Sequence, residues 1–392
     1  MSTNKTIQMR EFNGTDYDNL YPETMNNNLI NGSAIGSVKG IGVDSYYTPG
    51  QYSICEGYGT QSTGFASHAE GGISSDPAFG PIASGISSHA EGASCNASGN
   101  YSHAEGNSAV ASGISSHAEG DSTTSSGARS HAEGINGTAS GRYSHIEGNS
   151  TTAETCTTHS QGQYNKVNSG SDTTYSATQN AFVIGNGTDY DALSNAFRVV
   201  FDGNVYGGTY HSSGADYAEY FEWADENPNN EDRIGHFVAI ENGKIHVAAP
   251  GEDVIGVISG NGSVIGDAYD DQWQGQWMRD IYGRILYEDV SVTREVQGEF
   301  YENGNPKMET VVEHRMKLNP DYDATKPYTS RSQRKEWDAV GMLGKLVVID
   351  DGSCTIGEKC DCVSGGIATN GTKYRVIQRL DNTHIMILAS FL

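Results

Sequence analysis

The chain has 392 residues and a formal charge of −25, because 49 Asp and Glu outnumber 24 Lys and Arg. A chain this acidic repels nucleic acid and anionic lipid, which argues against non-specific binding to either. It has no apolar run of about 18 residues, and its first residues, MSTNKTIQMREF, lack the apolar core of a signal peptide. We therefore expect a soluble protein that is made in a cytoplasm, has no membrane span and is long enough for two or three domains.

The cysteines do not predict a disulfide framework or a metal centre. Six are scattered along the chain, and CDC at residues 360–362 has no second Cys or His pair at zinc spacing. We expect free thiols, no metal and no cofactor.

A repeat follows residue 50. The motif SHAEG, or a degenerate form of it, recurs along this segment. The first step between copies is 21 residues, and the next five are 14 residues each. The histidines of the motif are His68, His89, His103, His117, His131, His145 and His159. Each half of the period reads small–polar–Gly–x–x–Ser/Thr–x, and regular Gly suits turns with positive φ. The period predicts two short strands per coil, with coils stacked about 4.8 Å apart as a parallel β-solenoid.

The repeat offers little apolar surface for a core. Its coils bury Ala and an occasional Val or Ile, while ordering each residue costs about 1–2 kcal/mol of backbone entropy. We therefore expect sister chains wound about a shared axis. The recurring His and Glu are interpreted as a structural ladder, hydrogen-bonded within or between chains. A catalytic site needs one distinct constellation, and a metal site needs converging ligands.

The repeats resemble the head repeats of trimeric autotransporter adhesins over about Tyr52 to Gly187, ending at AFVIGNGT. This resemblance implies a left-handed parallel β-roll in a homotrimer. Those adhesins carry a signal peptide and a C-terminal membrane barrel, neither of which is recognisable here. The 22 tyrosines are expected to line strand faces rather than to bind sugars.

The second half predicts strands and hairpins. NAFRVVFDGNVYG alternates around an Asp202-Gly203 turn, and GHFVAIENGKIHVAA around Asn242-Gly243. EDVIGVISG, KLVVIDDGSCTIG and HIMILASFL read as further strands. We expect a mostly β module of about 180–200 residues, with an α+β arrangement as the alternative.

One acidic pair in this half occurs once, in GADYAEYFEW, as Asp216 and Glu219. The spacing alone favours a structural role for this pair. Asp216 could cap a helix with Glu219 reaching back to it, or both could lie on a solvated face.

Three separated motifs favour a catalytic role for the pair instead. They are NAFRVVFDGNVYGGTYHSSGADYAEYFEW, GEDVIGVISGNGSVIGDAYDDQW and RKEWDAVGMLGKLVVIDDGSC. Together, over residues 195–392, they resemble the self-cleaving intramolecular chaperone of phage neck-appendage and tail-fibre precursors, which is classed among glutamic-type peptidases. The resemblance implies that the module aligns three chains and then cuts itself off between Ala215 and Asp216. It makes Glu219 the leading acid/base and Asp216 its companion.

The chemistry suits two carboxylates. One activates a water and the other protonates the leaving amine, if their surroundings separate their pKa values. The aromatic neighbours of the pair, from Tyr217 to Trp223, offer a drier environment. The sequence names no oxyanion donor, and His211 is a weaker candidate for a role.

The sequence therefore predicts a mainly β protein: a virion-attachment segment (1–50), a β-roll (51–190) and an autoproteolytic chaperone (191–392). Residues 7–24, IQMREFNGTDYDNLYPET, resemble the attachment end of fibre proteins from phages of Gram-positive bacteria. The expected partners are two sister chains, a virion tail, baseplate or neck, and a host-surface glycan or protein; the expected location is the virion. The alternatives are a non-cleaving fibre whose C-terminal module is a trimer clamp or receptor-binding tip, and a secreted trimeric adhesin.

Overall fold

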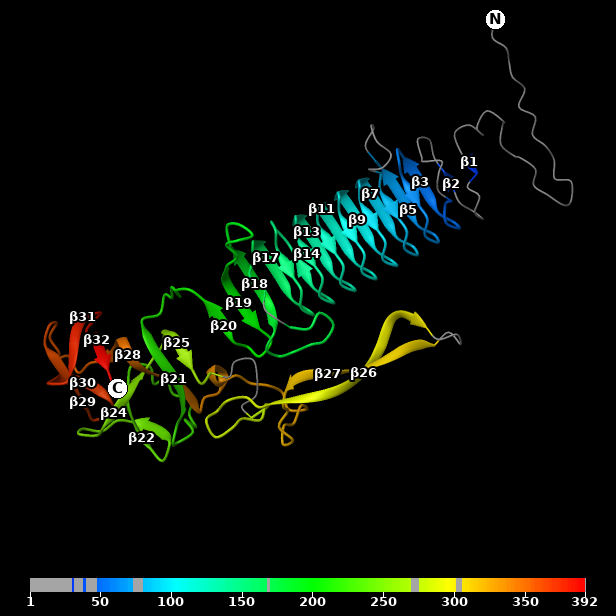
Figure 1. Cartoon of the computed structure of the whole chain (residues 1–392). Helices are drawn as coiled ribbons and strands as arrows, with labels where there is room; N and C mark the ends of the chain where they lie inside the picture. Colours follow the sequence, from blue (N-terminus) through cyan, green and yellow to red (C-terminus); the bar gives the residue numbers. More distant parts are fainter. Residues whose placement is uncertain are drawn as a thin grey trace, which may run out of the picture. The chain divides into compact units, whose positions relative to one another are not determined.

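A computed structural model of the chain describes residues 30–31, 38–39, 48–72, 80–167, 170–268, 275–300 and 305–391 (Figure 1). The described residues form strands, turns and one 3-10 turn, η2 (Arg331–Gln333), without an α-helix, so the mainly β prediction is confirmed. Across these ranges, no helix is long and apolar enough to cross a membrane. Most of the expected attachment segment, 1–50, lies outside them.

The chain divides into two compact units. Unit 1 comprises Met1–Gly208 together with Tyr287–Met316, and unit 2 comprises Thr209–Leu286 together with Lys317–Leu392.

Unit 1 contains the repeat, built as predicted from two short strands per coil; in most coils one of the two is longer than the other. The longer strands belong to a first sheet, whose members are β1 (Ile30–Asn31), β2 (Val38–Lys39), β3 (Ile54–Gly57), β5 (His68–Gly71), β7 (His89–Ala93), β9 (His103–Asn107), β11 (His117–Asp121), β13 (His131–Ile135), β15 (His145–Ile146), β17 (His159–Gln163), β18 (Asn180–Asn186), β19 (Asn195–Val200) and β20 (Val205–Gly207). The shorter strands form a second sheet of β4 (Gln61–Ser62), β6 (Ile82–Ala83), β8 (Asn96–Ala97), β10 (Val110–Ala111), β12 (Thr124–Ser125), β14 (Thr138–Ala139) and β16 (Thr152–Ala153).

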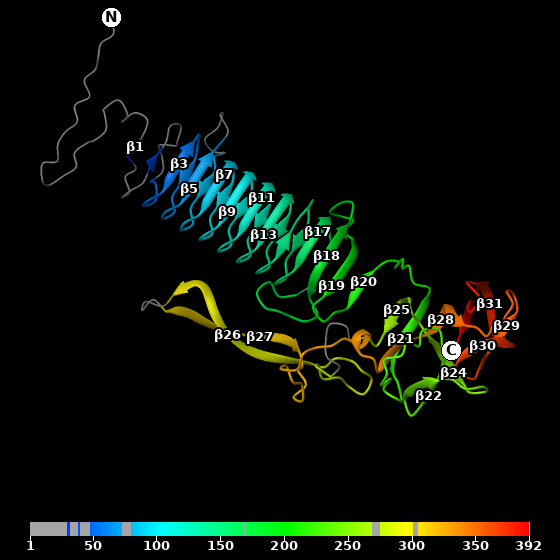
Figure 2. The same cartoon turned by 180° about the vertical axis from the view of Figure 1, so that it is seen from behind.

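Successive coils pair in parallel, and from β7 to β17 each pairs with the coil 14 residues further along. On β11 and β13, His117 lies opposite His131 and Glu119 opposite Glu133. Figures 1 and 2 show these strands stacked in chain order, with the coil repeating along the row. The parallel β-roll of the prediction is therefore confirmed. The sheet ends in antiparallel pairing of β18 with β19 and of β19 with β20, the latter around the predicted Asp202-Gly203 turn.

Small residues allow the coils to stack this closely. The inside of each coil holds Ala and Ser, such as Ala118 and Ser130, and the Ser130 hydroxyl donates to the Gly127 carbonyl at 2.7 Å. Gly120 has a φ of +107°, and a Cβ there would lie 2.1 Å from the carbonyl oxygen of Gly134. No other residue fits that turn without moving the next coil.

Tyrosines of the repeat occupy turns. Tyr52, Tyr101 and Tyr143 have φ values of 58°, 61° and 59° and are exposed. For these three residues, the expectation that tyrosines line strand faces is wrong, because each one falls on a left-handed corner of its coil.

A long hairpin of β26 (Tyr287–Phe300) and β27 (Pro306–Met316) also belongs to unit 1. The backbone N–H of Ala177 donates to the carbonyl of His314 at 3.0 Å, and the Tyr287 hydroxyl donates to Asp202 at 3.1 Å. A segment of the C-terminal half of the sequence is thereby hydrogen-bonded to the end of the repeat.

Unit 2 is built on one sheet in the order β23-β22-β24-β28-β32-β31-β29-β30, with β21 pairing β28 and β25 pairing β21. The strands are β21 (Asp216–Glu222), β22 (Phe237–Glu241), β23 (Lys244–Val247), β24 (Val254–Ile258), β25 (Gly262–Gly266), β28 (Trp337–Ile349), β29 (Lys359–Val363), β30 (Ile367–Gly371), β31 (Tyr374–Arg379) and β32 (His384–Ser390). The predicted Asn242-Gly243 hairpin is present as β22–β23. Two apolar clusters, around Phe237 and around Trp223, provide its core.

Candidate self-cleavage site

The predicted cleavage segment begins a strand. Residues Asp216–Glu222 form β21, which pairs in parallel with β25 and antiparallel with β28. The helix-cap alternative for Asp216 and Glu219 is therefore wrong. Side chains alternate along a strand, so Asp216 and Ala218 point to one face of the sheet, while Tyr217 and Glu219 point to the other.

Asp216 is the buried carboxylate of this segment, with 5% of its surface exposed. The Ser259 hydroxyl donates to Asp216 Oδ1 at 3.1 Å, whereas Oδ2 has no hydrogen-bond partner among the described residues. Burial raises the pKa of Asp216, against the lowering effects of Ser259 and of the residue's own backbone N–H. That N–H belongs to the Ala215–Asp216 peptide, so the carboxyl group lies beside the nitrogen that would leave in the predicted cut.

The carbonyl of the same peptide also has a defined partner. The backbone N–H of Lys345 donates to the Ala215 oxygen at 3.2 Å. Two glycines of β28 make this approach possible: a Cβ on Gly344 would lie 2.4 Å from the Ala215 oxygen, and one on Gly341 would lie 2.6 Å from Asp216 Oδ2. Charge developing on that oxygen during hydrolysis would meet a preorganised donor.

Glu219 lies on the opposite face of β21. The Tyr217 hydroxyl donates to its carboxylate, which raises the pKa of Tyr217. A Cβ on Gly266 would lie 3.0 Å from Glu219 Cγ, so β25 borders this group. Within the part of the chain that the structure describes, no hydrogen bond or ion pair joins Glu219 to the Ala215–Asp216 peptide. His211 is exposed and, in the same part, makes no side-chain bond.

Sequence reasoning missed Ser259 and the Lys345 amide, although both lie inside quoted motifs. GVISG carries Ser259, and GMLGKLV carries Gly341, Gly344 and Lys345. The structure brings these two motifs and GADYAEYFEW together at one peptide bond. Both residues were therefore within reach of sequence analysis, but their roles were not. The Lys345 donor is a backbone N–H, which any residue but proline provides, and the role of the Ser259 hydroxyl depends on which group lies beside it.

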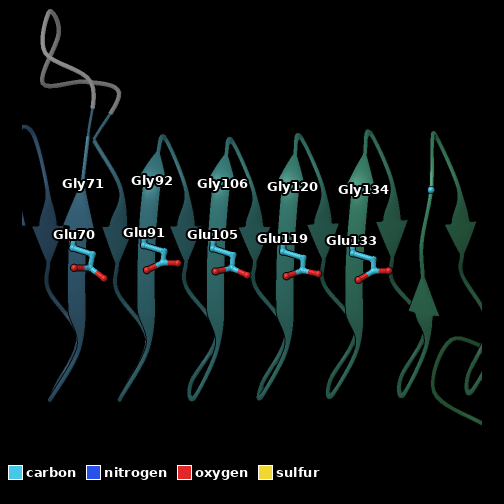
Figure 3. Close-up of a pocket in the computed structure, with 11 residues that line it drawn as sticks. Glu70, Gly71, Glu91, Gly92, Glu105, Gly106, Glu119, Gly120, Glu133 and Gly134 are labelled. Carbon is cyan, nitrogen blue, oxygen red and sulfur yellow. The ribbon is translucent and has the colours of Figure 1, made fainter.

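The repeated glutamates and the glycines that follow them line a groove along β5 to β13 (Figure 3). Three His–Glu–His groups have ligand atoms within 4.8 Å of one another, for example those of His117, Glu119 and His131. The His103 and His117 rings, however, stack 4.8 Å apart with an interplanar angle of 2°. Parallel rings aim their nitrogens side by side rather than at one point, whereas a metal needs convergent ligands about 2 Å away.

Comparison with known proteins gives the family. The profile described as Peptidase_G2, IMC autoproteolytic cleavage domain matches residues 151–383, more than half of the chain. The chain belongs to this family. Its resemblance to self-cleaving chaperones is thereby confirmed, and autoproteolytic cleavage is the activity for which the matched domain is named.

Two curated relatives are phage proteins. The preneck appendage protein of Bacillus phage PZA and the pre-neck appendage protein of Bacillus phage phi29 are each 38% identical over 163 residues, or 41% of this chain. The match spans 17% of the length of each relative. The solved structure of the pre-mature bacteriophage phi29 gene product 12 aligns with a TM-score of 0.54 at 22% identity, over 89% of this chain and 39% of that one, which shows a shared fold.

Proposed function

We propose that the chain is a homotrimeric phage or prophage appendage precursor that cleaves itself between Ala215 and Asp216. The observation that carries the proposal is the environment of that one peptide: an N–H donor on its carbonyl oxygen and a buried carboxyl beside its nitrogen. Membership of an autoproteolytic family supports the reaction, and the names of the relatives support the phage setting.

The reaction is a single hydrolysis. Water adds to the Ala215 carbonyl carbon, and the Lys345 N–H stabilises the oxygen as it becomes negative. Asp216, whose protonated form is favoured by burial, gives its proton to the leaving nitrogen and becomes a carboxylate. The C–N bond breaks, leaving a carboxylate at Ala215 and a free amine at Asp216. Because the cut peptide is already held in its site and is cut only once, modest rate enhancement is sufficient.

Glu219 is assigned the second task, which is to take a proton from the attacking water. It points away from the Asp216 face of its own strand, so we assign this base to a neighbouring copy in the trimer. Such an arrangement makes cleavage a checkpoint, since only an assembled trimer completes the site. The glutamic-type assignment rests on this role.

The mixing of two inactive chains tests this arrangement. Chains carrying Glu219→Gln keep Asp216, and chains carrying Asp216→Asn keep Glu219; each alone is expected to stay full-length. Co-folded, they form mixed trimers in which Glu219→Gln chains receive a base from a neighbour and are cut. If the mixture stays as intact as the separate chains, the neighbour does not supply the base; if Glu219→Gln alone is cut at the wild-type rate, Glu219 has no catalytic role.

The architecture supports a chaperone role. Near-identical coils can pair one period out of step, and in-register parallel pairing of three chains is slow. A module that folds and trimerises first would fix the register before the coils close. The hairpin β26–β27 is suited to this because it belongs to the C-terminal piece but bonds to the last coils, at Ala177 and Asp202. Attachment to the virion neck is assigned to residues 1–50, and host-surface binding to the mature roll.

Two alternatives predict different products. A non-cleaving fibre, with the C-terminal module as clamp or receptor-binding tip, would stay full-length after folding. A secreted trimeric adhesin would be found at the bacterial surface rather than in purified virions.

A further inference from the structure

The longer strands of the repeat turn one row of histidines and one row of glutamates outward. We call this surface the His/Glu face; its members are His68, Glu70, His89, Glu91, His103, Glu105, His117, Glu119, His131, Glu133, His145, Glu147 and His159. Adjacent rings stack with centroids 4.4–4.8 Å apart along the whole row. Figure 3 shows five of the glutamates, from Glu70 to Glu133, side by side on neighbouring strands.

One ring nitrogen of each histidine on this face lacks a hydrogen-bond partner among the described residues. Nε2 of every histidine in the row is buried and has no hydrogen bond in the described structure. The nearest carboxylate oxygens are 3.4 Å away for His89 and 3.7 Å for His117. Both distances exceed the about 2.7–3.2 Å of a good N–H···O bond. A buried nitrogen left in this state costs free energy, so the face is incomplete in one chain.

The charges of the face also conflict within one chain. Neighbouring carboxylates lie one coil apart, and hydrogen bonds with the carboxylates of Glu91 and Glu119, together with burial and their charge, raise the pKa of Glu105 to about 7. Burial lowers the pKa of His103 and His117, so these rings give little positive charge in return. Like charges stacked in register destabilise a sheet.

An apolar ridge borders the histidine row on the preceding turn. Phe65 and Ile86 are 48% and 42% exposed there. The half-buried Ile114 lies two coils beyond Ile86, with Asn100 at the equivalent position between them. The interior of the roll, by contrast, contains mainly Ala, including Ala104 and Ala118. Parallel sheets are usually covered on both faces, and the described residues of this chain cover the repeat sheet on one side only.

We propose that the His/Glu face and its apolar ridge form the surface through which copies of this chain meet. A second copy is the fitting occupant because it carries both rows at the same coil spacing. Each imidazole of one copy can then face a carboxylate of the next, which gives the buried nitrogens a partner. The ridge adds the apolar area that the Ala-filled interior lacks. This inference rests on the homotrimer proposed above and names its contact surface.

The proposal has a consequence for register. Neighbouring copies displaced by one coil would keep all inner pairs and lose only those at the ends. The face therefore holds chains together without fixing their alignment, which leaves alignment to the C-terminal module.

Cross-linking of the full chain tests the surface. The variant His117→Cys/Glu119→Cys places two thiols on the face, and Val110→Cys/Thr124→Cys places two on the outward side of the second sheet in adjacent coils. With a short bis-maleimide, the first variant is expected to give about tenfold more covalent dimer and trimer than the second, because only its thiols are held together between chains. Wild type supplies the background from native cysteines. Equal yields, or more from the control, would overturn the proposal.

A charge test uses the same two surfaces. His103→Asp/His117→Asp/His131→Asp should lower the guanidinium midpoint of trimer dissociation well below that of Val110→Asp/Thr124→Asp/Thr138→Asp. An equal fall in both, or a larger one in the control, counts against the His/Glu face. Sedimentation of wild type keeps the failures distinguishable: a monomeric wild type refutes the proposed trimer, whereas a trimer that cross-links through the other sheet refutes only this surface.

Discussion

The pH dependence of cleavage should respond to one hydroxyl group. Ser259 donates to Asp216 at 3.1 Å and so stabilises the charged form of a buried carboxyl group. In our mechanism Asp216 acts while protonated, so the rate falls as pH rises through its pKa. Ser259→Ala removes a donor to the carboxylate, raises the pKa of Asp216 further and keeps the acid protonated to higher pH.

The size of the effect follows from the contact. A hydrogen bond to a charged group contributes about 1.5–3 kcal/mol, and 1.36 kcal/mol corresponds to a tenfold change in a protonation equilibrium. At 3.1 Å the bond is long, so the lower value applies, and the alkaline limb of the rate profile should move up by about one pH unit.

The assay uses full-length chain kept unfolded in guanidinium and diluted into buffers from about pH 4 to about pH 9. Gel densitometry of the products gives a rate at each pH. Ser353→Ala is the control, because its hydroxyl bonds Thr369 rather than Asp216. An alkaline limb that stays in place, or moves to lower pH, would refute Asp216 as the general acid.

Three further predictions follow from close contacts. Gly341→Ala puts a Cβ 2.6 Å from Asp216 Oδ2 and should slow cleavage at least about tenfold, whereas Gly208→Ala, with nothing within 4 Å, should cleave normally in the same assay. Gly120→Ala forces an L-residue to a φ of +107° against the next coil and should destabilise the roll by at least about 2 kcal/mol in denaturant unfolding, against the same control. After cleavage, the two pieces should still co-elute under native conditions, since Tyr287 and His314 of one are hydrogen-bonded to Asp202 and Ala177 of the other; early separation would contradict that contact.

The repeat was the most predictable part of the fold. Few folds are compatible with a 14-residue period that has Gly at fixed positions. The strand pairing follows directly from the period, because His117 lies opposite His131, which is 14 residues further along. The Asp202-Gly203 and Asn242-Gly243 hairpins were equally accessible, because these dipeptides favour tight turns whatever surrounds them.

The site was predictable only in part. The segment Ala215–Asp216 could be named from its motif, but the spacing of Asp216 and Glu219 suits a helix as well as a strand. The segment forms a strand because it pairs with β28, more than a hundred residues away in the sequence. In that strand the two carboxylates lie on opposite faces of the sheet. The Lys345 amide and the Ser259 hydroxyl acquire meaning only through that pairing, which local sequence does not encode.

The positions of the tyrosines in the roll could not be predicted from residue propensity. Strand propensity placed them on sheet faces, yet Tyr52, Tyr101 and Tyr143 take left-handed turn positions. The repeat fixes backbone conformation at each corner, so the position overrides the preference of the residue.

The most direct test of self-cleavage is the mass of the products after folding of wild-type chain. We predict two species, residues 1–215 and 216–392, with a new N-terminus at Asp216 and one uncut band for Asp216→Asn. A wild-type chain that folds, trimerises and remains a single full-length species would contradict the central claim.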